Sequence, residues 1–367
     1  MRVLELFAGA GGAALGLHEA GFEHVACVER DPSAAATLRA AGFPAVEADV
    51  RDVDYGALAG TIDLLWASPP CQAWSGLGQR QGARDRDRNG WPWTLDVVER
   101  VRPTWAMMEN VPGMLGHPYL KTVVLPRLRR LFAHVDARVL NAADFGLPQA
   151  RRRLFIVAGP RPFVWPRASH GPDIGVPHVG VRDALKLGPD VVAMAHECNA
   201  GWGLARVPVS LEQPAPTLTA GSARSHGGNG LLLVKRGARL DEPLAPGSKL
   251  HRRATPAECA TLQGFPASYP FVGNATAQRA QIGNAVPPVL ASALGRAVLA
   301  VERGAATLRE TLPAVAAIAE RVLARAIAIV RGRPPRGVAV EDIDGFVERH
   351  GQRLRALVTT TLHRRAA

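Results

Sequence analysis

The sequence predicts an α/β fold: a doubly wound, mostly parallel sheet of the Rossmann-like kind, with a smaller loop-rich domain and a helical C-terminal tail. Three observations support this. Short apolar runs alternate with helical stretches over residues 1–160. A glycine-rich turn follows the first apolar run directly. Proline and glycine then become frequent over residues 161–250, where few long periodic segments occur.

The apolar runs give the expected strands in chain order. They lie at residues 3–6, 25–29, 62–67, 105–109, 135–140 and 154–158. Helices are expected at 11–20 and 33–41, the second with Asp31 as its N-cap and Pro32 at its first position. Thr255 and Glu258 have capping-box spacing at the start of a helix over 255–262, and another helix is expected over 281–301 around a turn at 284–288.

The charge balance is strongly basic. The formal net charge is +12 and the isoelectric point is about 10.6. Most of the basic residues are arginine, whose planar guanidinium suits phosphate and guanine, so an anionic partner is expected. A generally basic proteome or ordinary solubility would give the same balance.

The tail, residues 301–367, contains two amphipathic helical stretches at about 312–330 and 341–362. Two interpretations stay open: a solvated helical cap, and an appendage for nucleic-acid contact or dimerisation.

Neither a secretory signal nor a membrane span is expected. Glu5 and the glycines after it interrupt the apolar N-terminus, and the stretch at 312–330 contains three charged side chains. The four cysteines are scattered without CxxC spacing, so neither a disulfide framework nor a metal site is predicted. The expectation is a soluble protein of the reducing cytoplasm.

The first glycine-rich turn indicates a ligand site. Phe7-Ala8-Gly9-Ala10-Gly11-Gly12 lets the backbone approach a nucleotide-like ligand, although position 14 is Ala and the GxGxxG pattern is incomplete. Glu29, at the end of the second strand, can accept hydrogen bonds from both ribose hydroxyls. Asp49 is expected to meet an adenine amino group, or to be an ordinary surface carboxylate. The spacing alone does not choose between NAD and S-adenosylmethionine.

Cys71 is the candidate nucleophile. It follows Ser68-Pro69-Pro70 just past the carboxyl end of a central strand, which is where open α/β sheets bind ligands. The two prolines restrict the backbone and can hold the sulfur in one position. Cys27 and Cys259 are interpreted as packing residues, and Cys198 as structural.

Several motifs occur in an order that resembles the DNA cytosine-C5 methyltransferase family, of bacterial or phage type. They span residues 2–300, and only the tail lies outside the resemblance. The motifs are Phe7-Ala8-Gly9-Ala10-Gly11-Gly12, Pro70-Cys71-Gln72, Glu109-Asn110-Val111, Gln149-Ala150-Arg151-Arg152-Arg153, Leu262-Gln263-Gly264-Phe265-Pro266 and Gln281-Ile282-Gly283-Asn284.

The resemblance implies a specific chemistry. Cys71 would attack C6 of cytosine, Glu109 would hydrogen-bond N3 with a pKa raised by burial, and Arg153 would hold the ring through O2. Arg151 would support Arg153, and Asn110 would fix the loop that carries Glu109. The methyl donor would be S-adenosylmethionine, with S-adenosylhomocysteine as product and no metal. Its implied pocket consists of Phe7, Gly9, Gly11, Gly12, Glu29, Asp49, Pro70, Asn284, Ala285 and Val286.

Duplex DNA is the implied substrate, and the target cytosine must leave the helix to reach a thiol. The loop at 72–93 would close over it, and residues 161–250 correspond to a target-recognition domain. Gln149 could orient the catalytic loop or contact DNA. The expected DNA contacts are Gln72, Ser75, Arg80, Arg84, Gln149, Arg224, Ser225, His226 and Asn229.

The implied organisation has four parts. Residues 1–160 form the catalytic and cofactor-binding domain, 161–250 the target-recognition domain, 251–300 a return segment and 301–367 the tail. A monomer in the bacterial cytoplasm, associated with the nucleoid, is expected, with a cognate restriction endonuclease as a possible partner. No membrane contact is expected.

Three other functions fit part of the motif pattern. An amino methyltransferase acting on N4 or N6 would have Tyr where this chain has Cys71. A transfer RNA cytosine-C5 methyltransferase would lack much of the recognition domain. A catalytically silent DNA-binding relative would not need Cys71, Glu109 and Arg153 together.

Overall fold

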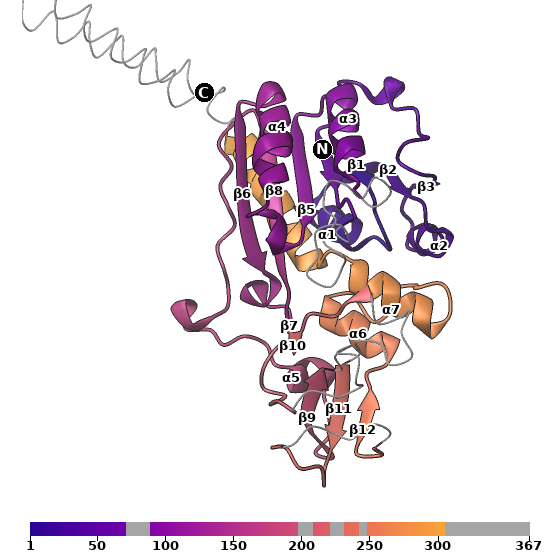
Figure 1. Cartoon of the computed structure of the whole chain (residues 1–367), viewed down its shortest axis with the longest axis vertical. Coiled ribbons are helices and arrows are strands. Elements are labelled where there is room, and N and C mark those ends of the chain that lie inside the picture. The colour runs from indigo at the N-terminus through magenta and orange to yellow at the C-terminus, as the bar shows by residue number, and fades with distance from the viewer. Residues whose placement is uncertain (71–88, 197–207, 221–230, 242–247, 305–367) are drawn as a thin grey trace, which may run out of the picture. The chain divides into compact units, whose positions relative to one another are not determined.

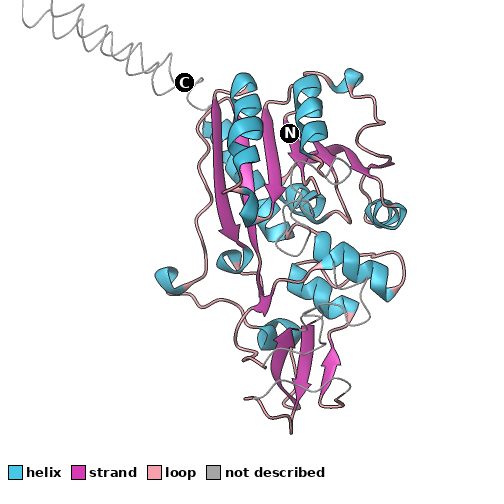
Figure 2. Cartoon of the chain, in the orientation of Figure 1, coloured by secondary structure: helices cyan, strands magenta, loops and turns pink. Residues whose placement is uncertain are grey.

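The structure is a computed structural model, and it describes residues 1–70, 89–196, 208–220, 231–241 and 248–304 (Figure 1). The chain divides into two compact units, residues 1–297 and 298–367. The features below belong to the first unit, apart from the end of one helix at residues 298–304. Figure 2 shows its strands and helices by colour.

A seven-stranded sheet dominates the first unit, in the order β3-β2-β1-β4-β5-β8-β6. Neighbouring strands from β3 to β5 are parallel, and β8 is antiparallel to both β5 and β6. This confirms the predicted doubly wound, mostly parallel sheet. Its strands are β1 Arg2–Leu6, β2 Glu23–Glu29, β3 Ala45–Glu47, β4 Leu64–Ala67, β5 Trp105–Asn110, β6 His134–Asn141 and β8 Arg152–Gly159.

Helices cover the sheet because apolar side chains from both kinds of element share one core. Trp91, Leu95 and Val98 of α3 pack with Leu65 of β4 and Met108 of β5, all at most 1% exposed. The helices of this part are α1 Gly12–Ala20, α2 Pro32–Ala40, α3 Trp91–Val101 and α4 Leu125–Leu131, with a π-helix at Leu120–Val124 and short 3-10 turns at Gly56–Leu58, Pro112–Met114 and Ala142–Phe145.

The predicted helix starts are largely confirmed. Asp31 accepts from the backbone N–H of Ala34 at the start of α2, and Thr255 and Glu258 form the full capping box of α6, Pro256–Gln263. The helix expected from 281 instead begins at 275, since Asn274 caps α7, Ala275–Asn284. The chain leaves the helix at 285–287 and is helical again from 288 to 304.

A second, three-stranded antiparallel sheet follows the main one. It contains β9 Val191–His196, β11 Leu231–Lys235 and β12 His251–Arg253, in the order β12-β11-β9. A two-stranded pair joins β7 Gln149–Ala150 to β10 Ala215–Pro216, and the short helices here are η6 Pro172–Ile174 and α5 Val181–Leu185. Leu231 and Leu233 share a core with Leu262 of α6 and Ile282 of α7. Residues expected to recognise the target are therefore packed onto the return segment.

One helical segment of the described chain, Ala275–Gly304, is long and apolar enough to cross a membrane. More than half of its most apolar window is buried in the protein, as in a core helix of a soluble protein, so this is weak evidence for a membrane span.

Candidate active site

The strand order reverses between β1 and β4, and a cavity of about 340 Å³ lies at the carboxyl ends of these strands. Segments far apart in the sequence contribute to its wall. They include the turn after β1, the ends of β2, β4 and β5, the arginines around β8 and the turn after α7. Glu29 and Glu109 both line it, so the predicted cofactor site and catalytic site share one cavity.

At one end of the cavity, Glu29 is held by backbone groups. Its two carboxylate oxygens accept hydrogen bonds from the N–H of Gly9 at 2.8 Å and of Asp31 at 2.7 Å. Burial raises the pKa of Glu29, and these N–H groups oppose the shift. Gly9 has a φ of 56°, which favours glycine, and nothing lies within 4 Å of the position of a Cβ there.

Asp49 also lines the cavity, but Arg51 occupies its carboxylate. Both oxygens accept from the Arg51 guanidinium at 2.9 Å, and Arg30 lies 3.6 Å away. Arg51 lowers the pKa of Asp49, so the group is a carboxylate at neutral pH. Contact with an adenine amino group stays a prediction, and it would require Asp49 to accept a second donor.

Gly11 and Gly12 are in the predicted cofactor set, yet neither lines the cavity. A Cβ on Gly12 would lie 2.2 Å from the carbonyl oxygen of Val286, and one on Gly11 would lie 2.6 Å from the hydroxyl of Tyr269. Gly12 therefore allows α1 to approach the segment after α7, and Gly11 leaves room for Tyr269, which lies between α6 and α7. The predicted residues Asn284, Ala285 and Val286 of that segment do line the cavity, as do Phe7 and Pro70.

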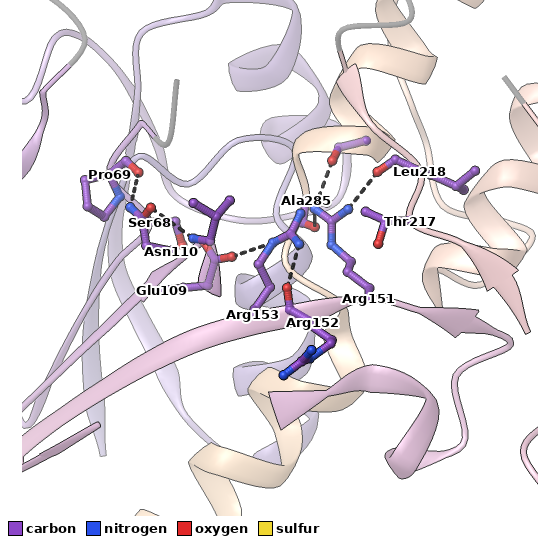
Figure 3. A network of polar contacts seen from close by, with 12 residues as sticks. Ser68, Pro69, Glu109, Asn110, Arg151, Arg152, Arg153, Thr217, Leu218 and Ala285 are labelled. Carbon is purple, nitrogen blue, oxygen red and sulfur yellow. Dashed lines mark hydrogen bonds and ion pairs between the residues drawn. The ribbon is translucent and has the colours of Figure 1, made fainter. Parts of the chain in front are cut away.

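At the other end of the cavity, Glu109 pairs with Arg153 (Figure 3). Oε1 of Glu109 lies 3.0 Å from Nε of Arg153, and both side chains are nearly buried. Burial raises the pKa of Glu109, while Arg153 and Arg151 act in the opposite direction. This end of the cavity thus presents a carboxyl group that can hold a proton beside a fixed guanidinium.

Asn110 connects this carboxyl to the predicted nucleophile segment. Its side-chain amide donates to the carbonyl oxygen of Pro69 at 3.1 Å, and its oxygen accepts from the N–H of Val111 at 2.9 Å (Figure 3). Pro69 and Pro70 line the cavity, and Cys71, the next residue, lies outside the described part of the chain.

Arg151 is buried behind Arg153 and holds backbone from two segments. Its guanidinium donates to the carbonyl oxygen of Leu218 at 2.7 Å and to those of Gly283 and Ala285 at 2.9 Å. This geometry agrees with a supporting role. A direct role of Arg151 in the chemistry stays a prediction.

The buried position of Gln149 contradicts its prediction as a DNA contact. Its side chain is fully buried and accepts from the N–H of Leu218 at 3.1 Å. Its amide donates to the carbonyl oxygen of Leu262 at 3.2 Å and to the side-chain oxygen of Gln263 at 2.8 Å. With no exposed surface, it cannot touch DNA in this conformation. Gln263 completes the network by donating to the carbonyl of Ala285. Gln263 belongs to one of the sequence motifs, but only the fold shows what its side chain does.

The remaining predicted DNA contacts lie outside the described residues. They are Gln72, Ser75, Arg80, Arg84, Arg224, Ser225, His226 and Asn229.

The arrangement can therefore bind an adenosine-like group at Glu29 and present an acid and a guanidinium to a planar, polar substrate at Glu109 and Arg153. The two ends open into the same cavity, so a group carried by the first ligand could be transferred directly to the second.

Known proteins resemble this chain in sequence and in fold. The sequence matches the family described as C-5 cytosine-specific DNA methylase over residues 1–169 and 212–300. The Type II methyltransferase M.AplI of Arthrospira platensis is 33% identical over 313 residues, which are 81% of this chain and 85% of the relative. M.NgoMIV of Neisseria gonorrhoeae is 32% identical over 319 residues, with 81% and 96% covered.

Solved structures share the fold. The methyltransferase EhMeth of Entamoeba histolytica superposes with a TM-score of 0.61 at 15% identity, covering 80% of this chain and 96% of that one. A putative DNA modification methyltransferase from an Escherichia coli prophage gives 0.54 at 20% identity, covering 83% and 99%. The chain therefore belongs to the C-5 cytosine-specific DNA methylase family, as an enzyme of the DNA (cytosine-5-)-methyltransferase class.

Proposed function

We propose that this protein transfers a methyl group from S-adenosylmethionine to C5 of a cytosine extruded from a specific duplex DNA sequence, through a covalent bond between Cys71 and C6. The observation that carries the proposal is the shared cavity. It reaches from Glu29 and Gly9 to Glu109 and Arg153, and the chain enters Cys71 directly from the Pro69-Pro70 wall.

The residues at the first end fit S-adenosylmethionine. The Glu29 carboxylate, fixed by Gly9 and Asp31, suits the paired hydroxyls of a ribose. The turn at Gly9 has open space where a Cβ would stand, which allows a ligand close to the backbone. When bound, S-adenosylmethionine supplies an electrophilic methyl group on a sulfonium.

The residues at the second end fit activation of cytosine. C5 becomes nucleophilic when the Cys71 thiolate adds to C6 and Glu109 donates its proton to N3, so that the ring electrons are shared with C5. The raised pKa of Glu109 favours this donor form, and Arg153 beside it suits the ring oxygen O2. C5 would then bond to the methyl carbon as the sulfur–methyl bond breaks, which leaves S-adenosylhomocysteine.

Release of the methylated base undoes the addition of Cys71 to C6 and the protonation of N3. A base, which we propose is water, removes the C5 proton, the C5–C6 double bond re-forms and the sulfur leaves C6 as a thiolate. The proton on N3 returns to Glu109, and the enzyme is ready for another turnover.

Duplex DNA is the proposed acceptor for two reasons. The similar proteins named above include Type II methyltransferases. The stretch 170–211, which the family match does not cover, lies within the proposed target-recognition domain at 161–250. We propose a monomer of the bacterial cytoplasm that acts at the nucleoid, with a cognate restriction endonuclease as its functional partner.

The decisive experiment incubates the full-length protein with labelled S-adenosylmethionine and either mixed-sequence duplex DNA or transfer RNA. Hydrolysis to nucleosides should yield labelled 5-methylcytosine from DNA. Label on N4 or N6, or in RNA alone, would refute the proposal. Bisulfite or nanopore mapping of DNA from expressing cells then gives the target sequence.

A trapped adduct tests the covalent step. When 5-fluorocytosine occupies the mapped position, C5 carries fluorine and methyl after transfer, so no proton can leave and the Cys71–C6 bond persists. Denaturing electrophoresis should show a protein–DNA band for the native protein and for the Cys259→Ser control, and none for Cys71→Ser. A band with Cys71→Ser would identify another nucleophile.

A further inference from the structure

A β-bulge brings three metal-ligating side chains to one face of the sheet beneath the glycine turn. Glu5 of β1 is in register with Cys27 of β2, so their side chains share a face. His24 is three residues before Cys27 and would point to the opposite face of a regular strand. The register shift between Val3 and Leu4 places an extra residue in β2, and this brings His24 to the same face.

The three side chains are buried and poorly satisfied. Glu5 is 1% exposed, the His24 side chain 2% and Cys27 0%. Oε2 of Glu5 faces Nε2 of His24 at 3.4 Å as an ion pair, and Nδ1 of His24 has no hydrogen-bond partner among the described residues. A buried ring nitrogen without a partner is unfavourable, so Nδ1 of His24 indicates a partner that the described residues do not supply.

The donor set suits a borderline-soft divalent cation. A carboxylate oxygen, an imidazole nitrogen and a thiolate are the three ligand types that Zn²⁺ uses in proteins. Neighbouring ligands of a tetrahedral zinc lie about 3.3–3.8 Å apart. Glu5 Oε2 and His24 Nε2 are already 3.4 Å apart, and all three ligand atoms lie within 4.8 Å of one another. Cys27 therefore needs to move by at most about 1 Å to complete the set.

We propose that Glu5, His24 and Cys27 bind a single divalent cation of the zinc class. The neighbouring cavity, which His24 lines together with His18 and Glu23, is open to solvent and supplies an entry path and a water for the fourth position. The T-shaped contact of His24 with Phe43, with ring centroids 5.2 Å apart, holds the imidazole in place.

Cation binding would support the first end of the active site. Glu5 lines the active-site cavity, and the charges of Glu5 and Glu29 interact. A bound cation would displace the Cys27 thiol proton and tie β1 to β2, the strands that lead to Gly9 and to Glu29. The sequence alone gives no sign of this cluster, because strand pairing joins residues 19 and 22 positions apart.

Metal retention tests the proposal on the full chain. The protein is equilibrated with Zn²⁺, dialysed without chelator and analysed by mass spectrometry for metal, alongside Cys27→Ala and the matched control Cys259→Ser. The native protein and the control should each retain a single zinc ion per chain, and Cys27→Ala should retain at least roughly tenfold less. Equal retention by all three proteins would overturn the proposal.

Cobalt spectroscopy gives a second readout, whose decisive arm uses the native protein and does not rely on Cys27→Ala. Co²⁺ bound through a thiolate shows a charge-transfer absorption in the near ultraviolet, which the native protein and Cys259→Ser should show. His24→Gln should weaken Co²⁺ binding while leaving the thiol present. Absence of the thiolate absorption in the native protein would show that the cluster is only a packing contact.

Discussion

The side-chain amide of Asn110 donates a hydrogen bond to the carbonyl oxygen of Pro69 at 3.1 Å. This bond joins the residue after Glu109 to the residue two positions before Cys71. The proposed acid belongs to strand β5, and the proposed nucleophile lies after strand β4. The Asn110 side chain links the ends of these two strands.

Asn110→Ala should lower the rate of methyl transfer by about 10- to 100-fold, because a displacement of about 1 Å at the reacting groups costs this much. Its affinity for S-adenosylmethionine should stay unchanged, since Asn110 does not line the cavity. Single-turnover methylation and calorimetry measure the two effects. Asn274→Ala, which removes the N-cap of α7, should cost about 1 kcal/mol of stability and little rate. Equal rate losses in both variants would argue against the proposed link.

Glu109→Gln should reduce turnover by roughly 10²- to 10⁴-fold, because an amide can hydrogen-bond N3 but cannot give it a proton. In the native enzyme, burial raises the pKa of Glu109, so the protonated donor persists to higher pH and kcat/KM falls as pH rises through that pKa. The residual activity of the variant should lack this fall. Glu99→Gln, at an exposed ion pair with Arg127, should retain the native profile. An unchanged profile in Glu109→Gln would assign the descending limb to another group.

Glu29→Ala should weaken binding of S-adenosylmethionine by about 10- to 100-fold, the value of one or two hydrogen bonds to a charged acceptor. Glu29→Gln should lose less, because one amide oxygen still accepts. Titration calorimetry on the full chain measures both. Glu23→Ala is the matched control, since Glu23 begins the same strand and is exposed. A similar affinity in Glu29→Ala and Glu23→Ala would place the ribose elsewhere.

The sequence was sufficient for the elements whose signals are local. Asp31 with Pro32, and Thr255 with Glu258, marked two helix starts because capping depends on residues within three positions. The apolar pattern predicts a helix only from residue 281, whereas α7 begins at Ala275, directly after its N-cap Asn274. Strands β9, β11 and β12 were also missed, since each is short and is stabilised by pairing across long stretches of chain.

The candidate site, too, could be predicted only in part from the sequence. Glu29, Glu109 and Arg153 could be named from motifs, and the fold brings all three to one cavity. The roles of Gln149 and Gln263 could not be read, because they depend on burial and on contacts between residues more than a hundred positions apart. The same applies to the Glu5 cluster, which requires the β-bulge.

Arg151 offers the sharpest test of how the active site is supported. Arg151→Ala leaves the carbonyl oxygens of Leu218, Gly283 and Ala285 without this donor, and each unsatisfied buried group costs about 1–3 kcal/mol. Arg152→Ala removes an equal charge from the adjacent, exposed position and should cost at most about 0.5 kcal/mol. The free energies of unfolding of the two variants, measured with urea, should therefore differ by several kcal/mol, although each variant loses one arginine. If Arg151 stabilised the fold only through its charge, the two variants would have similar unfolding midpoints, whereas a large difference that persists at high salt supports the hydrogen-bonding role. In Arg151→Lys, the charge remains but a single ammonium cannot reach three carbonyls, so the lysine variant should resemble Ala and not the native protein.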